Sequence, residues 1–159
     1  WAKGMNISNI SFQDLLTHKS GFRSDISDCN NNGSPLDYAT LKMVVANGVR
    51  AVDYGVPCYQ NLNFCLMRIL IPYINGHVYA GTDAADATQT SQKYVDYVEA
   101  KVMTPSGAFN TDVKSITSPP PHLYPFPDDA NPGVDAGNWT GIAGGGGWNI
   151  PVEIGRAHG

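Results

Sequence analysis

The chain has 159 residues, of which 42% are apolar and 15% charged, and its formal net charge is -4 at pH 7. This length and composition are typical of one globular domain with its own core and exclude global disorder. An acidic chain without clustered lysine and arginine also argues against nucleic-acid binding. The longest apolar run, residues 64–74, is too short to cross a bilayer and predicts a core helix rather than a membrane span.

The first predicted helix begins after Ser11 and ends near His18. Ser11 and Asp14 have the spacing of a capping box, in which a hydroxyl and a carboxylate bind the free amides of the first turn. The following residues 24–34 are crowded with Asp, Asn and Gly and predict a solvent-exposed loop.

Residues 34–37, Ser-Pro-Leu-Asp, predict a second helix. Serine can cap it, proline suits the first helical position, and aspartate favours the positive end of the helix dipole. Leu41, Val44 and Val45 then lie on one helical face, and the Asn-Gly pair at residues 47–48 ends the helix.

A third helix is predicted to begin at Asn63, whose side chain can cap it, and to stop at the Asn-Gly pair of residues 75–76. Pro72 is expected to kink or end this helix. Its apolar stripe comprises Leu66, Ile69, Leu70 and Tyr73.

Apolar residues recur at helical spacing over residues 90–103 and predict a fourth, amphipathic helix. The stretch 104–147 is rich in proline and glycine, which favours a long irregular excursion that needs a scaffold beneath it. We therefore expect residues 1–159 to form a single partial domain, mainly α with long irregular loops. The chain starts at Trp1 and has no helix-ending pattern at its other end, so we expect a piece of a longer polypeptide.

No cofactor or metal site is predicted. The glycines at residues 144–147 are not followed by the Lys-Ser/Thr of a phosphate loop, so they indicate a close-packed backbone turn. No grouping of histidine and cysteine has zinc-site spacing.

Cys29, Cys58 and Cys65 allow at most one internal disulfide, with the odd cysteine left for a partner outside the segment. Three buried, reduced thiols are an equal alternative. Four Asn-x-Ser/Thr triplets fit the glycosylation pattern, and together with the cysteines they favour an extracytoplasmic or secreted protein.

The most informative stretch is Cys-Tyr-Gln-Asn-Leu-Asn-Phe at residues 58–64. Tyr59 and Asn61 are two residues apart at the entry to an apolar run, so they can deliver a phenol and a carboxamide to one site. Alone, such a triplet is weak evidence. A tyrosine packed at a helix start and a helix-capping asparagine are the structural alternatives.

Residues 11–21, Ser-Phe-Gln-Asp-Leu-Leu-Thr-His-Lys-Ser-Gly, resemble the Leu-Leu-Thr-His-Thr-Ser-Gly signature of the beta-lactamase-related serine hydrolases. That family includes class C beta-lactamases, D-alanyl-D-alanine carboxypeptidases, D-aminopeptidases and family VIII esterases. Residues 1–4, 94–111 and 143–148 are similar to further phrases of the family, in the same order. The resemblance implies the helical portion of a beta-lactamase/transpeptidase-like α/β fold.

The resemblance also implies roles for the site residues. Tyr59 would share protons with the nucleophile and the leaving group, and Asn61 would donate its amide to the acyl-side carbonyl of the substrate. A phenol with an ordinary pKa near 10 is a poor base at neutral pH, so Tyr59 needs a neighbouring ammonium or a relay. His18 would be a buried structural partner rather than a catalytic base.

Two motifs that this chemistry requires are missing from the chain. No serine is followed by a lysine three positions on, and no Lys-Thr-Gly or His-x-Gly strand motif is found at the family's position. The resemblance places the first before Trp1 and the second after Gly159. We therefore expect the central part of a serine hydrolase, which binds its small-molecule or peptide substrate together with the rest of the parent chain and is inactive alone.

Two alternatives stay open. The chain could be a non-catalytic descendant that binds peptidoglycan-like peptides or a protein partner through the same cleft. It could also be a subdomain that docks on its own missing half, in which case it would expose apolar surface.

Overall fold

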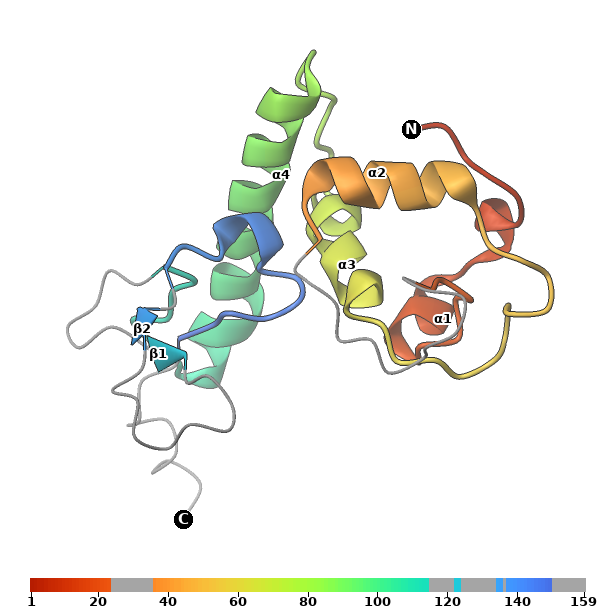
Figure 1. The fold of residues 1–159 in the computed structure, drawn as a ribbon. Coiled ribbons are helices and arrows are strands. Elements are labelled where there is room, and N and C mark those ends of the chain that lie inside the picture. Colours follow the sequence, from red (N-terminus) through yellow and green to blue (C-terminus); the bar gives the residue numbers. More distant parts are fainter. Residues whose placement is uncertain (24–35, 115–121, 124–133, 136, 150–159) are drawn as a thin grey trace.

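The computed structural model describes residues 1–23, 36–114, 122–123, 134–135 and 137–149 (Figure 1). The helices of this part are α1 (Phe12–Leu16), α2 (Tyr38–Asn47), α3 (Asn61–Ile74) and α4 (Asp83–Val98). A π-helical turn, Glu99–Met103, continues α4, and 3-10 turns cover Ile7–Asn9, Thr104–Ser106 and Thr140–Ile142. The predicted mainly α class is thus confirmed for these residues, and none of their helices is long and apolar enough to cross a membrane.

The helix α3 lies at the centre of the fold. In Figure 1, α4 lies on one side of α3, and α1 and α2 lie on the other. The main core gathers on α3 and comprises Leu15, Phe22, Tyr38, Leu41, Val45, Val49, Leu62, Cys65, Leu66, Met67 and Ile69. A smaller cluster of Val95, Val113 and Ala143 joins α4 to the residues near the end of the described chain. Of the predicted apolar stripe of α3, Leu66 and Ile69 are core and Leu70 packs against it, whereas Tyr73 is exposed.

The predicted capping box of α1 is confirmed. The Asp14 amide donates to Ser11 Oγ at 3.2 Å, and the Ser11 amide donates to Asp14 Oδ2 at 2.8 Å. The helix ends at Leu16, before the predicted end at His18, because His18 adopts a left-handed conformation with φ 56°. That turn directs the chain toward the start of α3.

The second helix ends as predicted but begins with a different cap. The N-cap of α2 is Asp37, whose side chain accepts the Thr40 amide at 2.8 Å, rather than the predicted Ser34, which lies outside the described residues. At the other end Gly48 adopts φ 80°, which only glycine adopts without strain.

The third helix continues through Pro72 and ends at Ile74. Proline removes one backbone donor, so a break is favoured there, but Pro72 is buried and the exposed residues Tyr73 and Ile74 still follow it in the helix. The Pro72 carbonyl accepts the His77 amide at 2.9 Å just beyond the helix. The predicted stop at residues 75–76 is confirmed, with Gly76 at φ 86°.

The fourth helix begins earlier than the predicted residue 90. Its N-cap is Thr82, whose Oγ1 accepts the Ala85 amide at 3.3 Å, and Asp83 and Asp86 occupy the first turn. These acidic residues stabilise the positive end of the helix dipole. The apolar spacing alone missed this start because the first turns of α4 are mainly polar.

The predicted excursion over residues 104–147 lies partly outside the described residues. Its described part holds only short elements, including the antiparallel two-residue strands β1 (His122–Leu123) and β2 (Val134–Asp135). The glycine turn is close-packed as predicted. A Cβ at Gly144 would overlap the Phe64 carbonyl of α3, and one at Gly147 would overlap the Trp139 ring.

A buried carboxylate, Asp86, connects three helices. It accepts hydrogen bonds from Tyr38 Oη of α2 at 2.6 Å, from Tyr73 Oη of α3 at 3.0 Å and from the Ala80 amide at 3.1 Å. His77 Nε2 lies 2.9 Å from the same carboxylate. Burial by itself would raise the pKa of this carboxyl, but the hydrogen bonds from Tyr38 and His77 outweigh it and lower the pKa.

The charge of Asp86 is balanced through His77. Lys93 Nζ lies 3.0 Å from His77 Nδ1. Because an ammonium only donates, Nδ1 acts as the acceptor and Nε2 carries the proton that binds Asp86. The His77 imidazole thus links a lysine to a buried carboxylate.

We predict that Asp86→Ala lowers the free energy of unfolding by about 3 to 5 kcal/mol, because removing one partner of a buried charged network leaves the other groups unpaired. Urea denaturation followed by circular dichroism measures this loss. The matched control is Asp96→Ala on the same helix, where an exposed carboxylate is expected to change stability by no more than about 0.5 kcal/mol. Equal losses in the two variants would contradict the role of Asp86.

Candidate active site

The two predicted site residues lie together where the loop enters α3. Tyr59 Oη donates a hydrogen bond to Asn61 Oδ1 at 3.0 Å. The Tyr59 side chain is 46% exposed, and Asn61 is half-buried at the first position of α3. The phenol and the carboxamide therefore converge at a surface that solvent reaches.

The backbone on either side of Tyr59 is bound to His18. The Cys58 amide donates to the His18 carbonyl at 2.8 Å, and the Gln60 amide donates to His18 Nδ1 at 3.2 Å. The rings of His18 and Tyr59 pack with centroids 4.4 Å apart, tilted by 37°. His18 thus sets both the course of the chain and the position of the phenol.

A buried, hydrogen-bonded pair, Ser20 and Asn63, lies next to His18. Ser20 Oγ donates to Asn63 Oδ1 at 2.6 Å, and Asn63 Nδ2 lies 3.1 Å from His18 Nδ1. The Phe64 ring meets the His18 ring edge to face at a centroid distance of 4.8 Å. The prediction that Asn63 caps α3 is wrong, because the helix begins at Asn61 and the Asn63 side chain is fully buried inside it.

His18 has the environment of a neutral imidazole. Burial lowers its pKa, and its Nδ1 faces two donors, so the proton of the neutral ring is on Nε2. This environment fits the interpretation of His18 as a structural partner. Among the described residues, no lysine is hydrogen-bonded to the Tyr59 hydroxyl, so the ammonium that would assist this phenol as a base has to come from elsewhere.

The described cysteines are buried. Cys65 on α3 carries a free thiol, and burial raises its pKa, which leaves it a poor nucleophile. Cys58 lies next to Tyr59, and its Sγ is 3.7 Å from Gln60 Nε2. Cys29 lies outside the described residues, so the predicted disulfide alternatives stay predictions.

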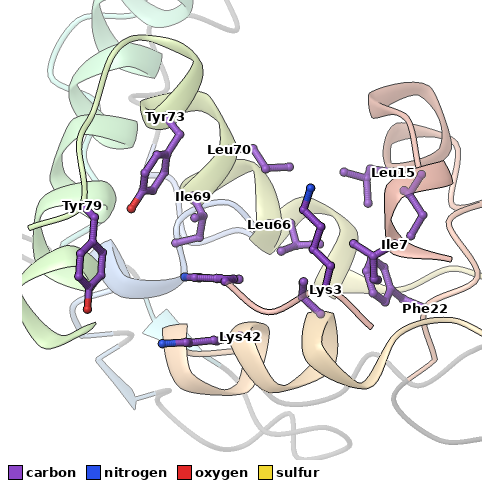
Figure 2. Close-up of a pocket in the computed structure, with 13 residues that line it drawn as sticks. Lys3, Ile7, Leu15, Phe22, Lys42, Leu66, Ile69, Leu70, Tyr73 and Tyr79 are labelled. Atoms are coloured by element: carbon purple, nitrogen blue, oxygen red, sulfur yellow. The ribbon is translucent and has the colours of Figure 1, made fainter. Parts of the chain in front are cut away.

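A second surface lies apart from Tyr59 and Asn61. It is an apolar groove of about 620 Å³ lined by Trp1, Lys3, Ile7, Ile10, Leu15, Phe22, Lys42, Val45, Leu66, Ile69, Leu70, Tyr73 and Tyr79. Figure 2 shows Lys3 extending into this groove between Leu15 and Leu70. Among the described residues the Lys3 ammonium has no ion-pair partner, whereas Lys42 is paired with Asp83 at 2.7 Å.

No protein-family model matches the chain, and neither a curated protein nor a solved structure matches it. The beta-lactamase-related resemblance therefore depends on the order of the sequence phrases. The geometry adds that residues from two of these phrases, His18 and Tyr59, are in contact. In the part of the chain that is described, no three side chains of His, Cys, Asp or Glu gather as metal ligands.

We predict that acidification weakens the fold through His18. Because its folded-state pKa lies below the ordinary value of 6.5, the stabilising contribution of the neutral ring is present above pH 6.5 and is lost as the pH falls through the folded-state pKa. His18→Asn, which tolerates the left-handed backbone, should reduce the loss of unfolding free energy between pH 7.5 and 5.0. Chemical denaturation at a series of pH values tests this, and an unchanged pH dependence in the variant would contradict it.

Proposed function

We propose that this chain supplies the tyrosine and asparagine of an acyl-transfer site in a beta-lactamase-like serine hydrolase that acts on an ester, amide or beta-lactam bond. The observation that carries the proposal is the hydrogen bond between Tyr59 and Asn61, at an exposed surface and directly beside His18. These residues come from the phrases that resemble the family, which lie far apart in the sequence.

In this proposal each side chain has one task. The Tyr59 hydroxyl moves a proton between the nucleophile and the leaving group, which is general acid and base catalysis. The Asn61 amide donates to the acyl-side carbonyl of the substrate and holds it in register. His18, with Ser20 and Asn63 behind it, acts as a positioning residue, since its Nδ1 is already occupied by donors.

The serine nucleophile and its lysine would come from the rest of the parent polypeptide. None of the 159 residues forms a Ser-x-x-Lys, so the chain alone is expected to be inactive. No cofactor is part of the proposal. The setting we propose for the parent protein is extracytoplasmic or secreted.

We predict that Tyr59→Phe in the parent polypeptide lowers kcat by about 100-fold or more, the usual contribution of a positioned acid or base. The measurement is turnover of a chromogenic cephalosporin and of short-chain p-nitrophenyl esters. The matched control is Tyr54→Phe, which removes a phenol bound to the Asn9 carbonyl and should leave kcat unchanged.

Two outcomes would contradict this proposal. One is turnover in the parent that survives Tyr59→Phe. The other is turnover by residues 1–159 alone, which would require a nucleophile that we have not identified.

The apolar groove favours a second candidate from another class, a binding function. Its lining is mainly aliphatic and aromatic, and its volume is in the range of pockets that hold a ligand. We propose that an apolar polypeptide segment of the missing half of the parent occupies it, with an acidic group facing Lys3. The free Lys3 ammonium supplies the complementary charge.

We predict that residues 1–159 bind the dye anilinonaphthalene sulfonate in this groove. Leu70→Gln, in the lining, should reduce the dye fluorescence at least about 3-fold, because it replaces apolar surface by an amide. Met43→Gln, at an equally apolar position on α2 that does not line the groove, is the control. Equal fluorescence in the two variants would contradict binding at this place.

A further inference from the structure

Arg68 is buried and forms no ion pair within 4 Å in the described part of the chain, although the Asp37 carboxylate is near enough to attract it. It lies on α3 with a relative exposure of 1%. Its Nη1 donates to Ser91 Oγ at 2.9 Å and its Nη2 to the Leu36 carbonyl at 3.4 Å, whereas its Nε has no partner. Burying an unpaired charge is costly, and burial lowers the pKa of this guanidinium, so a stable fold favours an anion beside it.

Arg68 lines a cavity of about 600 Å³ between α2 and α4. A second cation, Lys114, lines the same cavity and has no ion pair within the described residues. Thr140, also in the lining, has a buried Oγ1 without a partner. Two residues that each have a buried polar atom without a partner therefore line one cavity, although nearly all such groups are paired in folded proteins.

The N-terminus of α2 adds to the positive potential of this cavity. Tyr38 and Ala39, the first residues of α2, are part of its lining, and a helix start carries a partial positive charge. Two carboxylates also line it, and the charge of Asp37 acts on the Arg68 guanidinium. Asp37 accepts the Thr40 amide as the N-cap of α2, and Asp83 is paired with Lys42.

We propose that this cavity binds a small oxyanion, a carboxylate or a phosphate group, as the counter-ion of Arg68. The planar guanidinium suits such oxygens because its donors match their geometry. Lys114 is the second cation, and the Thr140 hydroxyl is a neutral donor. The proposed anion site shares no residue with the site of Tyr59 and Asn61, so the test of the anion site is independent of the proposed hydrolase function.

The test is a titration of residues 1–159 with sodium acetate and with inorganic phosphate at constant ionic strength, with sodium chloride as the reference. The Nε–Hε resonance of Arg68, assigned by its loss in Arg68→Met, reports binding at the guanidinium. We expect a saturable shift with one oxyanion and a rise in Tm that follows the same dissociation constant. Preference for acetate would identify a carboxylate site, and preference for phosphate a phosphate site.

Lys114→Gln should weaken this binding at least about 10-fold and keep the fold, since Lys114 lines the cavity and is only half-buried. Lys101→Gln, which removes an exposed cation elsewhere, is the matched control and should bind as the original chain does. The proposal is overturned if chloride has the same effect as both oxyanions. It is also overturned if Lys114→Gln and Lys101→Gln bind equally well.

Discussion

The carboxylate of Asp86 is the interaction on which the arrangement of the helices depends. A carboxylate inside a small core is stable only when hydrogen bonds replace its hydration, and here the donors come from α2, from α3 and from the chain between α3 and α4. The requirement to satisfy one charge therefore fixes the distances among three helices. Two of the donors also line the cavities, since Tyr38 lines the cavity beside Arg68 and Tyr73 lines the apolar groove.

The candidate site is built on a different support. His18 follows α1 in a left-handed conformation and accepts hydrogen bonds from the backbone on both sides of Tyr59. It packs next to the hydrogen-bonded pair of Ser20 and Asn63. A phenol that must transfer protons needs a defined position but also an open surface, and this arrangement provides both. Support from buried polar groups beneath an exposed side chain is what a functional site requires of its scaffold.

The two cavities differ in the chemistry that surrounds their unpaired cations. Lys3 extends into an apolar groove, whereas Arg68 and Lys114 line a cavity with hydroxyl, amide and carboxylate neighbours. An apolar polypeptide segment suits the first and a small oxyanion suits the second. The ion pair of Lys42 and Asp83 has one partner in the lining of each, so the two cavities are neighbours, and α2 and α3 contribute to the walls of both.

Sequence patterns determined the features that depend on neighbours along the chain. The capping box of Ser11 and Asp14, the glycine ends of α2 and α3 and the apolar stripe of α3 follow from short-range geometry, and the structure confirms them. The convergence of Tyr59 and Asn61 follows in the same way, because two residues at a helix start cannot lie far apart.

Tertiary structure decided which polar side chains are buried and what they bind. Asn63 reads as a cap by its type and place, yet it is fully buried, because Ser20 and His18 of a distant segment bind its amide. Asp86 and Arg68 look like ordinary surface charges in the sequence, and only the packing of α2, α3 and α4 encloses them. Propensity and capping act within a few residues, whereas the burial of a charge depends on partners brought together by the whole fold, and the sequence pattern contains no signal for these.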